Sequence, residues 1–217
     1  MQKRDPAADT GRMMRRAITG MLAASLTLVT PAAGARPIEG TPSSGSEAHV
    51  QALDDYFLPS AVQTEPGGTV AWDFTGDRTH SVTDASGMAL FDSGLVAPGG
   101  PRFAYAFAAA GTFRYVCTLH ETMRGRVWVV VEIDRSRRPH RQPFTLTWAT
   151  GPAPAGSVYD VQLKRPDRPW RIWLSDLSDA SAAFTPKHPG VFRVRARIRS
   201  LSDGMAEWSP ATRFEAT

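Results

Sequence analysis

From His49 to the end of the chain, apolar and polar residues alternate in short segments that are separated by clusters of glycine and proline. Clear cases are the segments Val70–Phe74 and Phe113–Cys117. Alternation with a period of two indicates β-strands that bury one face, and these segments carry no helical period. Many short strands without helices predict an all-β fold, either a sandwich or a barrel.

The pattern divides into two series of predicted strands on either side of a basic segment, residues 134–142. The first series is expected at residues 49–53, 56–63, 68–74, 79–84, 102–108, 111–117 and 125–133. The second series is expected at residues 143–149, 156–164, 169–174, 181–185, 190–199 and 206–215. We therefore predict two β-sandwich domains, residues 49–133 and 143–217, joined by a linker at residues 134–142.

The residues before the first series predict export. Three arginines, Arg12, Arg15 and Arg16, precede a low-charge run that ends in Ala-Gly-Ala at residue 35. A basic segment, an apolar segment and small residues in this order are typical of a secretory signal peptide, residues 1–35. Cleavage leaves residues 36–48 as a flexible leader and places the protein in the periplasm or outside the cell. A retained membrane anchor is the alternative, but the glycines and proline of this run suit a spanning helix poorly. No later segment is long and apolar enough to span a membrane.

The net charge of the chain is +4, but most of it belongs to the predicted signal peptide. Cleavage removes five basic and two acidic residues and leaves 20 basic and 19 acidic ones. This balance gives no support for binding to nucleic acid. Residues 36–131 carry a net charge of −4 and residues 132–217 one of +5, which fits either steering toward a charged partner or ordinary solvated charge.

The strongest chemical signal is the segment Cys117–Met123, which holds the one cysteine of the chain, His120 and Met123 within seven residues. A single cysteine cannot form an intramolecular disulfide, so the thiol of an exported protein needs another role. Thiolate, imidazole and thioether are the ligands of a mononuclear type 1 copper site, because soft sulfur holds Cu(I) and imidazole also suits Cu(II). The segment lacks a second histidine, and His80 on an earlier predicted strand is the obvious candidate. We predict one copper ion per chain, held by His80, Cys117, His120 and Met123.

Each of these residues has an ordinary alternative when it is considered alone. A buried cysteine is usually a small apolar residue, and methionine usually fills a core. Taken together, at this spacing and on these strands, the four residues favour a metal site. Ser81 and the backbone around Thr118 are expected to donate hydrogen bonds to the sulfur of Cys117. The remaining histidines have no second ligand near them in the sequence and are expected at the surface: His49, His140 and His188.

Several motifs around the predicted ligands resemble the cupredoxin family, especially its plastocyanin and amicyanin branch. They are Phe57-Leu58-Pro59, Gly67–Trp72, His80-Ser81-Val82, Phe91–Gly94, Gly111–Cys117 and the ligand loop. The resemblance covers about residues 49–132 and implies a Greek-key β-sandwich. It also implies that His80, Cys117 and His120 are equatorial copper ligands and that Met123 is the axial one. Two residues stand between His120 and Met123, as in amicyanins, although Leu119 replaces the proline usual there.

This resemblance implies a one-electron carrier and not an enzyme. Oxidases and nitrite reductases of the same family need further copper ions, commonly held by His-x-His pairs, and the sequence contains no such pair. The electron would pass through His120 to a redox partner protein, which the sequence does not identify. An apolar patch around His120, with contributions from Leu119 and Met123, would receive that partner.

The second series resembles a fibronectin type III domain over roughly residues 141–217. The motifs are Leu146-Thr147-Trp148, the strand at residues 190–199 and Glu207-Trp208-Ser209-Pro210. The resemblance implies a seven-stranded sandwich that spaces or binds and carries out no catalysis.

One strand of this second series has arginine at every other position, Arg193 to Arg199. A structural interpretation is that these guanidinium groups stack on Trp170, Trp173 or Trp208. The functional interpretation is a patch that binds an acidic surface polymer or an acidic protein. We favour the structural interpretation.

These observations predict an exported type 1 copper protein that carries single electrons and has a fibronectin type III-like module for docking or positioning. Two alternatives keep the fold but change the function. One is a surface-binding or adhesion protein in which the first sandwich is a scaffold, and the other is a copper-scavenging protein.

Overall fold

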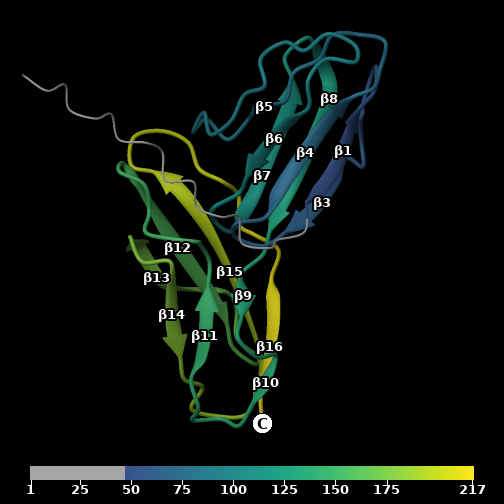
Figure 1. Cartoon of the computed structure of the whole chain (residues 1–217). Coiled ribbons are helices and arrows are strands. Elements are labelled where there is room, and N and C mark those ends of the chain that lie inside the picture. Colours follow the sequence, from purple (N-terminus) through teal and green to yellow (C-terminus); the bar gives the residue numbers. More distant parts are fainter. Residues whose placement is uncertain (1–46) are drawn as a thin grey trace, which may run out of the picture. The chain divides into compact units, whose positions relative to one another are not determined.

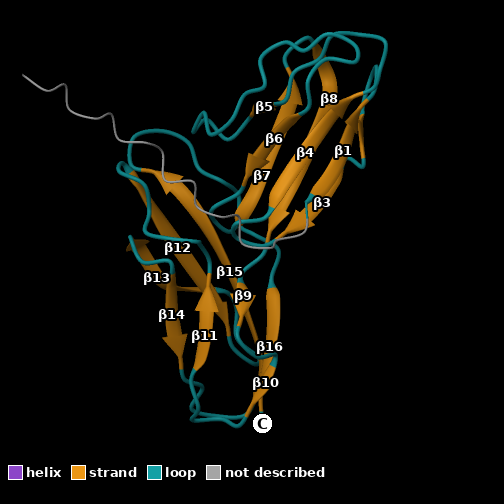
Figure 2. Cartoon of the chain, in the orientation of Figure 1, coloured by secondary structure: helices purple, strands orange, loops and turns teal. Residues whose placement is uncertain are grey.

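The computed structural model describes residues 47–217. The predicted signal peptide and all but the last two residues of the predicted leader lie outside the described residues. The described residues form sixteen strands joined by loops and turns, without helices (Figures 1 and 2), which confirms the prediction of an all-β fold. Accordingly, residues 47–217 contain no helix that is long and apolar enough to cross a membrane.

The first eight strands build two four-stranded sheets. The strands are β1 Ala48–Ala52, β2 Phe57–Leu58, β3 Ala61–Thr64, β4 Thr69–Phe74, β5 Thr83–Asp84, β6 Phe103–Ala106, β7 Gly111–Cys117 and β8 His120–Val129. One sheet has the order β2-β1-β4-β6 and the other the order β3-β8-β7-β5. The pairs β1–β4 and β3–β8 are parallel, whereas the other neighbours are antiparallel.

Aromatic side chains fill the space between these two sheets. Trp72 on β4 and Tyr115 on β7 are both fully buried, and their rings meet edge to face with centroids 5.3 Å apart. Phe57 on β2 meets the other side of Tyr115 at 4.8 Å. Such pairs add stability beyond the burial of their area. The sheets therefore pack face to face as a sandwich, with the inward alternation expected for β4 and β7.

The first series differs from its prediction at three places. The strand expected at residues 56–63 is interrupted at Pro59, whose ring removes a backbone donor, and becomes β2 and β3. The strand expected at residues 79–84 is reduced to β5, with His80 in an isolated bridge before it. The strand expected at residues 125–133 begins earlier, at His120, because the β7–β8 hairpin closes tightly.

The remaining strands build a second pair of sheets. They are β9 Glu132–Ile133, β10 Arg137–Arg138, β11 Phe144–Thr147, β12 Ser157–Lys164, β13 Arg171–Leu177, β14 Ser181–Phe184, β15 Gly190–Ser200 and β16 Thr212–Ala216. The three-stranded sheet has the order β14-β11-β9, and the five-stranded sheet has the order β10-β16-β15-β12-β13. Residues 134–142, expected as a linker, contain β10, which pairs with β16.

The two sheets of this second group also face each other across an aromatic core. Phe144 on β11 lies 4.8 Å from Phe214 on β16, and Phe184 on β14 lies 5.4 Å from Phe192 on β15, measured between ring centroids. Trp148 is fully buried and satisfies its indole N–H by donating to the carbonyl of Asp179 at 2.7 Å. The second series is therefore a second β-sandwich.

The arginine-rich strand is β15, and three of its four arginines have partners in the second sandwich. Arg195 stacks on Trp170, and Arg197 stacks on Trp208, each with its guanidinium carbon 4.4 Å from the ring centroid. Arg197 and Arg199 both donate to the carboxylate of Asp160, which is buried on β12. The structural interpretation is confirmed for Arg195 and Arg197, which stack on Trp170 and Trp208, whereas Arg199 is held by ion pairs and stacks on no tryptophan in the described residues.

β8 contains a glycine at the position where it crosses the ring of Tyr115. Gly125 pairs with Tyr115 in the β7–β8 ladder, and a Cβ atom at residue 125 would lie 2.2 Å from Cζ of that ring. Because Tyr115 is fully buried, its ring has no free space to move into. Gly125 therefore allows β8 to pack closely against the Tyr115 ring of β7, the strand that ends at Cys117.

Replacing this glycine tests the close approach. Gly125→Ala should lower the free energy of unfolding by about 1–3 kcal/mol, because an added methyl group overpacks a filled core. Urea denaturation measures the change. Gly151→Ala is the control, since a Cβ there meets no atom within 4 Å, and it should change the free energy by less than about 0.5 kcal/mol. Equal effects of the two substitutions would contradict this account.

Candidate metal centre

His80 is held in place by its own backbone. It forms an isolated antiparallel bridge with Val96, in which the His80 amide donates to the Val96 carbonyl at 3.0 Å. The Val96 amide donates back to the His80 carbonyl at 2.8 Å. The side chain of His80 is completely buried. Two backbone hydrogen bonds and full burial leave this imidazole little freedom to move.

Cys117 and His120 occupy the two sides of one tight hairpin. Cys117 is the last residue of β7 and His120 is the first of β8, with Thr118 and Leu119 between them. The two residues pair directly, after a register shift between Val116 and Cys117. Such a bulge re-aims a side chain at the end of a ladder. Here the thiol is buried and the His120 ring is half-buried.

These three side chains converge on a single point. Nδ1 of His120 lies 3.4 Å from Sγ of Cys117, and Nδ1 of His80 lies 3.8 Å from the same sulfur. The three candidate ligand atoms all lie within 4.8 Å of one another, and the two imidazole rings have centroids 4.9 Å apart. The structure therefore brings together three of the four predicted ligands from two separate segments of the chain.

Met123 is the fourth predicted ligand. Its side chain is fully buried on β8, three residues after His120. Its role as an axial ligand stays a prediction. The expectation that Met123 contributes to a surface patch around His120 is wrong, because none of the side chain is exposed.

Ser81 ties the His80 segment to the end of β7. Its backbone amide donates to Sγ of Cys117 at 3.4 Å, which confirms the hydrogen bond expected from this residue. The amide of Thr118, however, donates to the Ser81 hydroxyl at 3.0 Å and not to the sulfur. The same hydroxyl also lies within hydrogen-bonding distance of the Thr83 and Thr118 hydroxyl groups. Ser81 thus fixes the separation between the two segments that carry the ligands.

The environment of His80 keeps its imidazole neutral. Burial lowers the pKa of His80, and the neighbouring His120 ring lowers it further. Both effects disfavour the imidazolium form. A neutral imidazole presents a lone pair, which a metal ligand requires.

The donor set fits copper. A thiolate and two imidazoles in a compact trigonal arrangement are the ligands of an electron-transfer copper site. In the described residues, Nε2 of buried His80 has no hydrogen-bond partner, so this ring is held by its backbone and its packing.

The other histidines of the chain lie away from this cluster in the described structure. More than half of the His49 side chain is exposed, next to the carboxylates of Glu47 and Asp73. His140 lies within hydrogen-bonding distance of the Thr217 carbonyl, and His188 is exposed. The expectation that these histidines lie at the surface is confirmed for His49 and His188, whereas His140 is half-buried.

No protein-family model matches the chain, and a search of curated proteins gives no match. Solved structures do resemble part of it. A purple cupredoxin from Nitrosopumilus maritimus is 23% identical, over 38% of this chain and 98% of its own, with a TM-score of 0.35. Amicyanin from Paracoccus versutus is 26% identical, over 39% of this chain and 81% of its own, with a TM-score of 0.34.

A third similar structure is the copper-containing nitrite reductase of Thermus scotoductus, 23% identical over 39% of this chain and 22% of its own, with a TM-score of 0.33. These similarities concern about two fifths of the chain at low TM-scores. The functional argument therefore depends on the geometry of the site itself.

Removing the Ser81 hydroxyl tests its role as a clamp. Ser81→Ala keeps the backbone donor to Cys117 but loses the hydroxyl that accepts from the Thr118 amide. Copper affinity should fall by about 10- to 100-fold, as for other groups that orient metal ligands. Competition with a chelator of known affinity measures the change. Ser60→Ala removes an exposed hydroxyl and should leave the affinity unchanged; an equal loss in both variants would contradict the clamp.

Proposed function

We propose that this protein is an exported type 1 copper protein of the cupredoxin class that carries one electron at a time. The observation that carries this proposal is the convergence of two Nδ1 atoms and one Sγ within 4.8 Å at the end of a rigid sandwich. Bound copper would supply the reversible Cu(I)/Cu(II) couple. His80, Cys117 and His120 would hold it, with Met123 as the weak axial ligand.

The rigidity of the site supports electron transfer in particular. A carrier works with a small barrier when its ligands keep their positions in both oxidation states. His80 is fixed by a backbone bridge, and Cys117 is fixed at a strand end by the amide of Ser81. Both side chains are buried in a close-packed region, where movement is costly.

The proposed exit for the electron is His120. It is the one member of the cluster that is partly exposed, whereas His80 and Cys117 are buried. Its neighbour Leu119 has 52% of its surface exposed. Leu95, next to the residue that pairs with His80, is 61% exposed. Exposed apolar side chains near a redox ligand suit brief docking of a partner protein.

We propose that the second sandwich is a fibronectin type III-like module that docks or positions the copper domain. The division into β9, β11 and β14 in one sheet and β12, β13, β15 and β16 in the other supports this, because three plus four strands are expected for such a sandwich. The short β10 is an addition. Export is supported by the order of residues before the first sandwich.

Loading the protein with Cu(II) tests the proposed site. The wild-type protein should become intensely blue, because a Cys117 thiolate bound to Cu(II) absorbs visible light by charge transfer. Cys117→Ala should be colourless, since no other sulfur in the set is a thiolate. Visible absorption and electron paramagnetic resonance measure both outcomes.

The control for this experiment is His49→Ala, which removes an exposed histidine outside the cluster and should leave the protein blue. A colourless wild-type protein would overturn the proposed site.

Voltammetry separates a carrier from a copper store, because a carrier exchanges one electron fast and reversibly. Copper that binds but does not cycle would contradict the carrier function.

A substitution at Leu119 tests the proposed exit without touching a ligand. Leu119→Asp should slow electron self-exchange between two copies by about tenfold or more, because two docked patches would then carry like charges. The blue colour should persist. Nuclear magnetic resonance line broadening in mixtures of Cu(I) and Cu(II) protein measures the rate. Leu201→Asp, at a leucine of the second sandwich that is 62% exposed, should leave the rate unchanged, and equal slowing by both would contradict the exit.

A further inference from the structure

Arg193 is the one arginine of β15 whose side chain has no partner in the described residues. Within residues 47–217 it makes no ion pair, no side-chain hydrogen bond and no contact over an aromatic ring, whereas Arg195, Arg197 and Arg199 all have partners. Its side chain is exposed. The guanidinium of Arg193 is therefore available to a ligand.

Two further cations lie directly opposite Arg193 in the sheet. Lys164 on β12 and Arg213 on β16 are its register partners on either side. Directly opposite residues of antiparallel strands share a face, with Cβ atoms roughly 4.5–5.5 Å apart. Three adjacent strands thus place three positive charges in one row. Of this row, Arg213 has an acidic partner, Glu215, at 3.3 Å, and Glu215 is also paired with Arg137.

Such a row lowers the stability of the sheet, because like charges opposite each other repel. Within the described residues, Lys164 and Arg193 have no acidic partner that would relieve this repulsion. A bound anion would relieve it. The row is therefore better explained by binding than by folding.

The loop after β12 extends the row with two more arginines in a rigid turn. The amide of Arg168 donates to the carbonyl of Arg165 at 3.2 Å, and prolines occupy positions 166 and 169. The start of β15 packs against this turn so closely that a Cβ at Gly190 would lie 2.5 Å from Cγ of Pro166. A rigid turn presents its charges without a large ordering cost.

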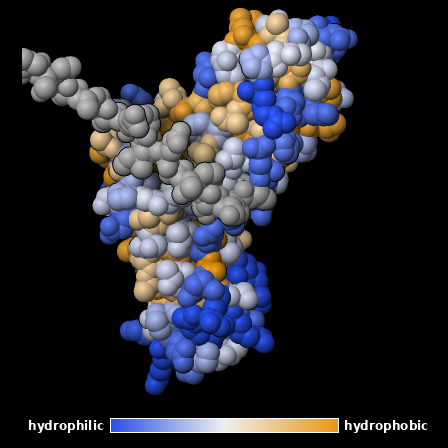
Figure 3. All heavy atoms as spheres, in the orientation of Figure 1, coloured by the Kyte–Doolittle hydropathy of each residue, from blue (hydrophilic) through white to orange (hydrophobic). Residues whose placement is uncertain are grey.

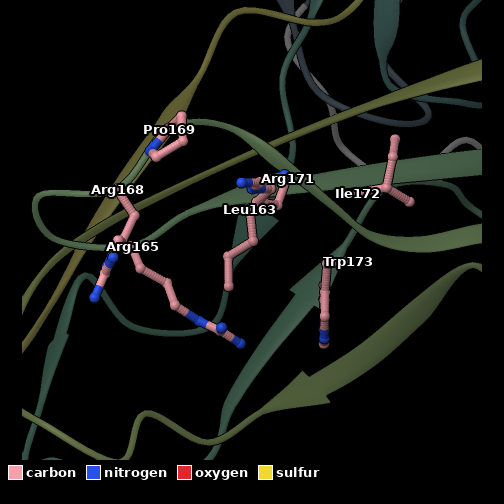
Figure 4. Close-up of a pocket in the computed structure, with 7 residues that line it drawn as sticks. All are labelled: Leu163, Arg165, Arg168, Pro169, Arg171, Ile172 and Trp173. Carbon is pink, nitrogen blue, oxygen red and sulfur yellow. The ribbon is translucent and has the colours of Figure 1, made fainter.

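Two surface depressions meet at this turn. One, of about 780 Å³, is bordered by the charged row and the turn. The other, of about 640 Å³, is bordered by the turn, Arg171 and Trp173 (Figure 4). Arg165 and Arg168 border both depressions. We call the cations that border the two depressions the basic track: Lys164, Arg165, Arg168, Arg171, Arg193 and Arg213.

The basic track carries six positive charges and a single acidic residue on its border, Asp167. Hydrophilic residues also gather in Figure 3 at the end of the second sandwich where β10 and the end of β16 lie in Figure 1. Six cations spread over two neighbouring depressions suit a polymer with repeated negative charges better than one small anion.

We propose that the basic track binds an acidic polysaccharide with a carboxylate on each sugar, a polyuronate. Arginine presents a planar fork that pairs with a carboxylate through two parallel hydrogen bonds. Pro169 and Ile172 border the depression shown in Figure 4, and both are exposed, so they offer apolar surface to the CH faces of sugar rings. This proposal uses no ligand of the metal centre and is independent of the copper chemistry.

An acidic peptide fits the basic track less well. The edge strand β13 has two register shifts against β12, and such irregularities hinder the addition of a peptide strand.

A single-stranded nucleic acid fits less well for a different reason. Its binding depends on aromatic rings on which bases stack. Trp170 and Trp208 are already covered by Arg195 and Arg197. Trp173 is partly buried and packs edge to face against Phe184 at 5.5 Å.

The experiment measures binding of the full chain to polygalacturonate by isothermal titration calorimetry at low and moderate salt. Poly-L-glutamate, single-stranded DNA and neutral dextran are the comparison polymers. Lys164→Gln with Arg193→Gln removes two charges from the row and should weaken binding at least about tenfold. Arg126→Gln with Arg135→Gln removes two exposed charges elsewhere and should weaken it less than about twofold.

Thermal unfolding of the same variants separates binding from folding. Removing like charges from the row should leave Tm unchanged or raise it, whereas a structural role for Lys164 and Arg193 would lower it and overturn the proposal. Absence of polygalacturonate binding, equal loss in the two double variants, or equally tight binding of poly-L-glutamate or DNA would also overturn it. Blue colour with Cu(II) reports the copper site separately, so each proposal can fail alone.

Discussion

The hydrogen bond from the Ser81 amide to the sulfur of Cys117 is the contact on which the metal centre depends. This bond joins Ser81, which follows His80, to Cys117 at the end of β7. The hairpin after Cys117 leads to the second histidine, His120. The ligands come from segments 37 positions apart, and only a fixed separation of these segments holds their nitrogen and sulfur atoms within bonding range of one ion. β5, which follows the His80 segment, pairs with β7 through Thr83 and Val116 and so holds the two segments side by side.

Within β7 the same alternation serves the core and the site. Tyr115 and Cys117 lie two residues apart and share the inward face, so the strand that packs the aromatic core also delivers the thiol. Burial raises the pKa of Tyr115 to about 12, so its phenol stays neutral in the core at ordinary pH. Gly125 on β8 leaves room for this ring, and the hairpin can then close two residues beyond Cys117. Core packing and ligand geometry are therefore one constraint on this hairpin.

The part of this arrangement that could be predicted from the sequence is the local part. Period-two alternation identified most strands, and the spacing of Cys117, His120 and Met123 identified the hairpin that carries the site. The bridge between His80 and Val96 could not be predicted, because it joins distant segments and the residues around Val96 show no alternation. The bonds of the Ser81 hydroxyl were missed for the same reason, since a serine before a valine carries no signal of its own.

The arginines of β15 are a second case in which a local sequence pattern does not predict long-range contacts. Their alternation predicted one wet face, but their sequence neighbourhood does not distinguish Arg197 from Arg193. The difference comes from the partner strands: β12 places buried Asp160 beside Arg197 and Arg199, and places Lys164 opposite Arg193. Register between strands decides which charges are neutralised and which are left for a ligand. Long-range pairing, which local patterns do not encode, thus determines both the metal centre and the basic track.

The two sites also place independent demands on the chain. The metal centre uses β7, β8 and the segment around His80, whereas the basic track uses β12, β13, β15 and β16 with the turn at residues 165–169. No residue belongs to both, and substitutions without shared partners usually have additive effects. A chain built in this way can change the geometry of its metal centre through the Ser81 network while the basic track stays the same. Likewise, Lys164 and Arg213, the charges opposite Arg193, contact no copper ligand and can change without altering the metal centre.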